Sequence, residues 1–271
     1  MPIANATLFH RQRRKALIRI GILIIAMSAM LTMIPVWLLD ICLISMIGIA
    51  TMILITSLIK KNASILPGIL LIATLFRCSL NFATTSLILS LKETGQVIET
   101  IGNYAIAPSI YVGIIIFIIF MIIFMIIIKN LTRIIAEISV RFILDAMPAK
   151  QIAVDADLTA GKITEKDAHK KRSDIAKNAD FYGAADGVMK IIKKDAMVGI
   201  SLTFINIICG TVLGVAIYGM EIAKAAEIFT KLTIGAGFAT QIPALMFCVS
   251  LRIMTRRENS KTTGKHLTTA F

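Results

Sequence analysis

The stretch RIIAEISVRFILDAMPAKQIAVDAD, residues 133–157, is the first polar segment to interrupt the long apolar runs of this chain. It opens with apolar residues at three- and four-residue spacing: Ile134, Ile135, Ile138 and Phe142. This spacing predicts an amphipathic helix. Glu137 lies four residues from both Arg133 and Arg141, so it can pair with either cation on the helix surface. Pro148 is expected to end or bend that helix, because proline lacks a backbone N–H and clashes with the preceding turn.

Four apolar runs precede this stretch and two follow it. They cover residues 20–39, 41–59, 62–91, 105–128, 196–220 and 232–251. Runs of about 20 residues are long enough to cross a hydrocarbon core of roughly 30 Å as helices. The 271-residue chain is 57% hydrophobic and 17% charged, with a mean hydropathy of +0.83. The expected fold class is therefore all-α, a polytopic helical membrane protein with about six transmembrane helices.

Residues 129–195 form the one sizeable polar region, with 13 basic and 10 acidic side chains. Thr164, followed three residues later by Asp167, resembles a capping box. Helices are expected over about 164–179 and 184–194, which makes this region a small helical domain between spans four and five. The predicted organisation has five parts: a basic N-terminus (1–19), four spans (20–128), the polar domain (129–195), two spans (196–251) and a basic tail (252–271). Residues 92–103 and 221–231 are expected to be short loops.

The basic residues are distributed unevenly between the two sides of the predicted bundle. Of 29 Lys and Arg residues, 25 fall in four segments that six spans would place on one side: 1–19, 60–61, 129–195 and 252–271. Loops rich in Lys and Arg stay on the cytoplasmic side of a membrane. Both termini and the polar domain are therefore expected to be cytoplasmic, with the spans in contact with the lipid bilayer.

Arg77 is the one charged residue inside the third apolar run. A cation at mid-span costs about 2.5–3.5 kcal/mol on an insertion scale, so Arg77 should face protein or water. Asn81 and Thr84 follow at helical spacing and complete a polar stripe. The stripe either joins neighbouring helices by hydrogen bonds or lines a water-accessible path.

The last two apolar runs contain residues that affect helix packing and helix continuity. Asn206, Gly210 and Gly214 recur every four residues, which indicates a face for close helix packing. The run 232–251 contains four residues that favour an interrupted helix: Gly235, Gly237, Gln241 and Pro243.

Four carboxylates lie at or near the cytoplasmic ends of predicted spans: Asp145, Asp155, Asp157 and Asp195. A partly desolvated carboxylate has a raised pKa and can exchange protons near neutral pH, so these four are candidates for coupling to a proton gradient. Plainer interpretations stand beside this one. Asp195 directly precedes an apolar run and could be a helix N-cap, and Asp155 and Asp157 could be ordinary turn residues.

Other classes of function lack the residues they need. The chain has no GxxxxGK[ST], GxSxG or HExxH motif, so no enzymatic activity and no cofactor are predicted. The four cysteines and three histidines are isolated from one another, which predicts no metal site. The net charge of +13 arises beside apolar runs without interleaved aromatic residues, so nucleic acid is not an expected partner.

Five segments together resemble one family. They are LFRCSLNFATTSLIL (75–89), RIIAEISVRFILDAMPAKQIAVDADLTAG (133–161), FYGAADGVMK (181–190), KKDAMVGI (193–200) and LTIGAGFATQIPAL (232–245). In this order they resemble the type III secretion export-gate family, the large inner-membrane subunit of flagella and injectisomes.

The resemblance implies a function in protein secretion across the bacterial inner membrane, driven by the proton gradient. It implies a homo-oligomeric ring, taken to be a nonamer, with three kinds of partner: other export-apparatus membrane proteins, the secretion ATPase complex and the secreted proteins. It also implies that Asp155 takes part in proton-driven export, and it matches Lys150, Asp195 and Arg77 to charged positions of the family motifs.

The sequence also departs from the family pattern. The last two spans and the large soluble C-terminal domain are expected to be missing, and residues 252–271 have no recognised counterpart. Ala236 stands where the family has an acidic residue, and Ser86 where it has an arginine. Two alternatives therefore remain open: a truncated structural remnant that does not export, and a small stand-alone proton-coupled transporter with a site formed by Arg77, Asn81 and Gln241.

Overall fold

The computed structural model describes residues 34–59, 66–91, 95–106 and 109–267. These residues are helical apart from short turns. The elements are α2 (Val36–Ile59), α3 (Leu66–Leu91), α4 (Gln96–Ile106), α5 (Ile110–Arg141), the π-helical turn η1 (Phe142–Ala146), α6 (Met147–Thr159), α7 (Glu165–Ala216) and α8 (Ile222–Leu267). Five helical stretches in this part of the chain are long and apolar enough to cross a membrane. The prediction of an all-α polytopic membrane protein is confirmed, and most of the predicted first span, 20–39, lies outside the described residues.

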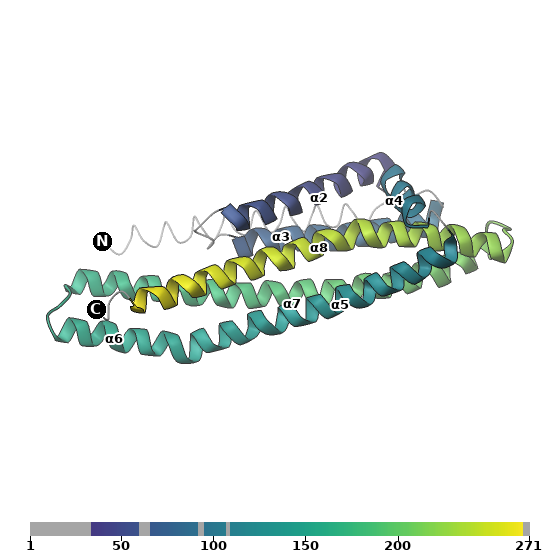
Figure 1. Cartoon of the computed structure of the whole chain (residues 1–271). Coiled ribbons are helices and arrows are strands. Elements are labelled where there is room, and N and C mark those ends of the chain that lie inside the picture. Colours follow the sequence, from purple (N-terminus) through teal and green to yellow (C-terminus); the bar gives the residue numbers. More distant parts are fainter. Residues whose placement is uncertain (1–33, 60–65, 92–94, 107–108, 268–271) are drawn as a thin grey trace.

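The long helices lie alongside one another in an elongated bundle (Figure 1). α8 contacts α2, α3, α4, α5 and α7, and it is the most deeply buried of the candidate spans among the described residues. α4 and the turn between α7 and α8 lie at one end of the bundle. The hairpin formed by α6 and the first part of α7 lies at the opposite end. α8 is therefore the element against which the other spans are positioned.

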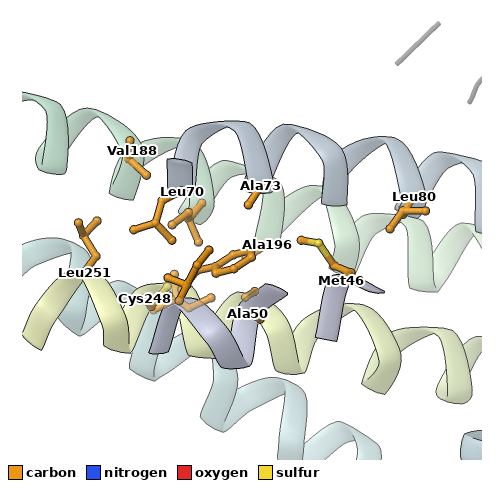
Figure 2. Packing of buried hydrophobic residues seen from close by; sticks show 14 of the residues in the cluster. Met46, Ala50, Leu70, Ala73, Leu80, Val188, Ala196, Cys248 and Leu251 are labelled. Carbon is orange, nitrogen blue, oxygen red and sulfur yellow. The ribbon is translucent and has the colours of Figure 1, made fainter. Parts of the chain in front are cut away.

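The apolar core lies where α2, α3, α7 and α8 meet (Figure 2). Side chains from all four helices are buried there, among them Met46, Leu70, Ala196 and Cys248. The outward faces of α2 and α5 are covered by exposed isoleucines instead, such as Ile44, Ile118 and Ile122. Exposed apolar faces of this kind are what lipid covers in a helical membrane protein.

The helix predicted from residue 133 onward buries the apolar face that its spacing indicated, since Ile135 and Phe142 are 0% and 3% exposed. Two outcomes were predicted for Pro148, an end or a bend of this helix, and the end is wrong. The chain forms the π-helical turn η1, in which the Met147 N–H donates to the Phe142 carbonyl, and it continues as α6 with Pro148 in the first turn. Proline is tolerated there because the first helical turn does not need its N–H.

α7 is a single helix of 52 residues, although two separate helices and a span were predicted for this part of the chain. Its N-terminus is capped as expected, because the Thr164 Oγ1 accepts a hydrogen bond from the Asp167 N–H at 3.2 Å. Gly183 and Gly187 lie within the helix and do not interrupt it. The predicted polar domain is thus a hairpin of helices that continue directly into the spans.

The predicted loop at 92–103 contains the helix α4, which corrects the sequence-based expectation. Asp40, in α2, accepts hydrogen bonds from the Gln96 N–H at 2.9 Å and the Val97 N–H at 3.2 Å. These are unpaired donors at the start of α4, and a carboxylate there also interacts favourably with the helix dipole. A charged side chain from one helix therefore fixes the position of the next.

α8 is also continuous, so both the predicted interruption of 232–251 and the predicted loop at 221–231 are wrong. Pro243 lies inside the helix. Gly235 allows α4 to approach, because a Cβ there would lie 2.9 Å from the Gly102 backbone nitrogen. The predicted packing face of Gly210 and Gly214 is confirmed, since Phe229 of α8 lies directly against both glycines.

Candidate functional site

Arg77 lies near the middle of α3 and is 1% exposed. Its Nη2 donates to Oδ2 of Asp195 in α7, and its Nη1 donates to the Thr240 carbonyl of α8 at 3.1 Å. Both charged side chains are almost fully buried. The prediction that Arg77 faces protein rather than lipid is confirmed, and the pair joins three helices at one point.

Asp195 lies far inside α7, which begins at Glu165, so the interpretation of Asp195 as an N-cap is wrong. The residue is 5% exposed and faces Arg77. Taking either charge out of water alone is costly, and their mutual attraction together with the hydrogen bond to Thr240 offsets part of that cost. Asp195 is thus the buried counter-charge of Arg77.

A polar recess lies next to this pair, between α3, α7 and α8. Its volume is about 20 Å³. Its polar lining residues are Asn81, Thr84 and Thr85 from α3, Thr203 and Asn206 from α7, and Thr233, Thr240 and Gln241 from α8. The predicted stripe on α3 therefore faces polar side chains from two other helices. One hydrogen bond crosses between helices, from Asn206 Nδ2 to Thr85 Oγ1 at 3.3 Å.

Gly199 leaves room for the side chains in this recess. A Cβ at Gly199 would lie 3.9 Å from both the Asn81 Nδ2 and the Gln241 Nε2 atoms. The structure thus brings together Asn81 and Gln241, two of the three residues that a mid-membrane site was expected to use, with Arg77 one turn away on α3. The volume of about 20 Å³ is close to that of one water molecule and far below that of a metabolite.

The other three candidate carboxylates lie on the surface of the hairpin, away from this recess. Asp155 Oδ1 accepts a hydrogen bond from Arg172 Nη2 at 2.5 Å, and Asp157 Oδ2 lies 3.4 Å from Lys171 Nζ. The side chains of Asp155 and Asp157 are 58% and 40% exposed. Asp145 is exposed on the π-helical turn. Among the four candidates only Asp195 is buried, and the role of all four in proton coupling stays a prediction.

The remaining predicted polar residues lie on α5 and on the hairpin. Lys150 Nζ lies 5.5 Å from the centre of the Phe142 ring, within range of a cation–π contact. Glu137 pairs with Arg133 at 3.5 Å, which is one of its two predicted pairings. Arg141 is exposed at the end of α5. Nowhere in the part of the chain that the structure describes do three potential metal ligands gather.

Sequence reasoning missed the threonines of α8 and the pairing of Arg77 with Asp195. Thr233 and Thr240 are seven residues apart, a helical spacing that places both on the face carrying Gln241. Arg77 and Asp195 are separated by 118 residues. The signal for the pair was present as a single cation inside one apolar run and a single acid at the edge of another.

Comparison with known proteins matches residues 24–271 to the FHIPEP family. The chain is 45% identical over 230 residues to the flagellar biosynthesis protein FlhA of Bacillus subtilis, covering 84% of this chain and 34% of the relative. It is 39% identical over 244 residues to FlhA of Salmonella typhimurium (87% and 35%). It is 35% identical over 248 residues to the low calcium response locus protein D of Yersinia pestis (90% and 35%).

The chain spans about a third of the length of these curated relatives. No solved structure matches it. The family match reaches residue 271, so it includes the basic tail 252–271, for which the sequence motifs had given no counterpart.

Proposed function

The chain belongs to the FHIPEP family, and on that premise we propose that it forms membrane-spanning helices of a type III protein export gate and helps couple the proton gradient to export. The buried ion pair between Arg77 and Asp195 is the observation that supports this proposal. A helix bundle that only anchored a protein would have no need of two charges inside its apolar core, where charged residues are costly and usually functional.

The hairpin of α6 and α7 is proposed to project into the cytoplasm. Residues 165–194 of α7 would extend about 45 Å at about 1.5 Å per residue. Exposed aromatic side chains gather at the opposite end of the bundle: Trp37, Tyr104 and Tyr111. Aromatic belts mark membrane interfaces, and Lys and Arg accumulate on the cytoplasmic side. In this proposed orientation both termini are cytoplasmic, and the membrane is proposed to be the bacterial inner membrane.

Further parts of the proposal come from the family resemblance. Copies of the chain assemble into a ring, taken to be a nonamer, together with other export-apparatus membrane proteins, the secretion ATPase complex and the secreted proteins. By that resemblance Asp155 responds to protons, and Lys150 is a matched charged position. Asp145 and Asp157 are further proton-coupling candidates because of their place near the predicted span ends, and Arg141 is a supporting charge. The long, exposed hairpin offers a surface on which such contacts can form.

The alternative of a stand-alone transporter is poorly supported by the recess. Asn81 and Gln241 do meet near Arg77, as that alternative required. The recess, at about 20 Å³, nevertheless has room for about one water molecule, which argues against a metabolite as the transported species.

The proposed function is tested in a full-length FlhA whose matching membrane segment is replaced by residues 24–271 of this chain. We expect Asp195→Asn to abolish secretion of export substrates into the medium, because Arg77 then loses its counter-charge. The control is Asp174→Asn on the same helix, which removes an exposed pair with Lys177 and should leave secretion unchanged. Undiminished secretion by the Asp195→Asn protein, present at normal levels in the membrane, would refute the proposal.

A further inference from the structure

Three buried oxygen atoms, on residues that line the polar recess beside Arg77, lack a hydrogen-bond donor within the described part of the chain. They are Thr84 Oγ1, Asn206 Oδ1 and Gln241 Oε1. The three residues are 2%, 4% and 2% exposed, and each comes from a different helix. Because buried polar atoms almost always have a partner, three such atoms around one space indicate that a ligand occupies it.

The chemistry of these atoms limits the ligand. Two are amide carbonyl oxygens, which can only accept hydrogen bonds, and the third belongs to a hydroxyl. The ligand must therefore supply N–H or O–H donors, and a neutral ligand needs no counter-charge here because Asp195 already balances the nearby Arg77 guanidinium. The recess encloses about 20 Å³, and a water molecule needs about 10–15 Å³ by the same measure.

We propose that this recess binds an ordered water molecule inside the membrane, held by Thr84, Asn206 and Gln241. Water supplies two O–H donors for the three oxygens and can itself accept from an amide N–H, such as Asn81 Nδ2 or Gln241 Nε2. Gly199 keeps the space open, since both of these nitrogens lie 3.9 Å from where its Cβ would be. The site is built by α3, α7 and α8 together, so it exists only in the packed bundle.

The water site extends the polar interior beyond the ion pair. Asn81 lies one turn of α3 past Arg77, and Thr84 lies about one turn further. Water at this position continues the hydrogen-bonding path from the Arg77–Asp195 pair along α3. Its use as a step in proton movement rests on the proposed function, but its existence does not.

Hydroxyl-radical footprinting of the purified chain in lipid nanodiscs tests the site, because radicals generated from a bound water oxidise the side chains beside it. The reporter is Leu202→Met, since Leu202 lines the recess and methionine is readily oxidised to the sulfoxide. The matched control is Ile200→Met, at a half-buried position on the same helix that does not line the recess. We expect oxidation of the Leu202→Met reporter to be several-fold faster than that of the Ile200→Met control.

Substitutions that remove the oxygen atoms should abolish the difference between the oxidation rates of the reporter and the control. In the Leu202→Met background, Thr84→Val replaces the hydroxyl by a methyl group of similar size, and Asn206→Leu replaces the amide by an apolar side chain. We expect each change to reduce oxidation to the rate of the Ile200→Met control. Thr84→Val keeps the volume of the side chain, so it gives a usable result even if Asn206→Leu prevents folding, which size-exclusion chromatography reveals.

Two results would overturn the proposal. Equal oxidation of Leu202→Met and Ile200→Met would show that no water is held in the recess. Protection of Leu202→Met by sodium or potassium chloride, relative to choline chloride, would show that a monovalent cation occupies the oxygens instead. The experiment does not involve export, so its outcome is independent of whether the proposed function is correct.

Discussion

The interior of the bundle and the surface of the hairpin both hold carboxylate–cation pairs, in opposite surroundings. Inside the bundle, Asp195 and Arg77 are almost completely buried and the guanidinium also donates to a backbone carbonyl. On the hairpin, Asp155 pairs with Arg172 at 2.5 Å, and about half of each side chain is exposed. The groups are chemically alike, and the difference lies in what surrounds them.

The surroundings decide what each pair can contribute. An exposed pair is weakened by water and salt and is worth about 0–1 kcal/mol. A buried pair adds little net stability over apolar side chains, yet breaking it is costly because one charge then stays buried alone. The bundle therefore depends on Asp195 and Arg77 being present together, whereas the hairpin can lose either member of its pairs at little cost.

Breaking the buried pair should have the largest effect. We expect Asp195→Leu to lower the free energy of unfolding by about 3–5 kcal/mol, because the Arg77 guanidinium loses its counter-charge in the core. Arg77→Met combined with Asp195→Leu should regain most of that loss, since two apolar side chains replace the pair. Unfolding of the purified chain by SDS titration in mild detergent, followed by circular dichroism, measures both values.

Asp174→Leu is the control for this experiment, because Asp174 forms an exposed pair with Lys177 on the same helix. Its effect should remain within about 0.5 kcal/mol. If Asp195→Leu lowered the free energy of unfolding no more than Asp174→Leu does, the buried pair would matter no more for stability than the exposed one. A double variant as unstable as Asp195→Leu alone would show that shape rather than charge decides the stability of this site.

The sequence predicted the faces of the helices better than their ends or partners. Periodicity placed Arg77 and Asn81 on one polar stripe and Gly210 and Gly214 on one packing face, because a helix repeats every 3.6 residues wherever it lies. The ends of two helices were predicted wrongly because a proline is tolerated there. Pro148 is tolerated because it lies in the first turn of α6, after the π-helical turn. Pro243 is buried inside α8, where tertiary packing outweighs local propensity.

The candidate site was predicted only in part for the same reason. The residues Asn81 and Gln241 were selected, but no local pattern indicates that α3 lies against both α7 and α8. One of the two interpretations of Asp195 was a capping role, because a polar residue before an apolar run usually has one. Its true partner is 118 residues away, and only the folded bundle brings the two together.

Two glycines of α7, one in the bundle and one in the hairpin, differ in the space around them. A Cβ at Gly210 would lie 2.7 Å from Phe229 Cγ, so Gly210→Ala should destabilise the bundle by about 1–3 kcal/mol. Gly187 has no atom within 4 Å of its Cβ position, so Gly187→Ala should stabilise the hairpin by about 0.5–1 kcal/mol. The same SDS titration measures both. If both substitutions changed the free energy of unfolding in the same direction, the two glycines would not differ in packing as described. Phe229→Leu should partly restore the stability lost in Gly210→Ala.

The smallest effect on stability is expected where the hairpin pair is broken. Asp155→Asn should lower the free energy of unfolding by less than about 1 kcal/mol, and the difference should shrink further in high salt, which screens the attraction of Arg172. In a full-length FlhA carrying this segment, however, we propose that Asp155→Asn abolishes secretion. Normal stability with lost secretion would assign Asp155 to the export process rather than to holding the hairpin together. Normal secretion would remove Asp155 from the proposed proton-coupling groups and leave Asp195 as the strongest candidate, because among the four carboxylates it alone is buried beside a fixed cation.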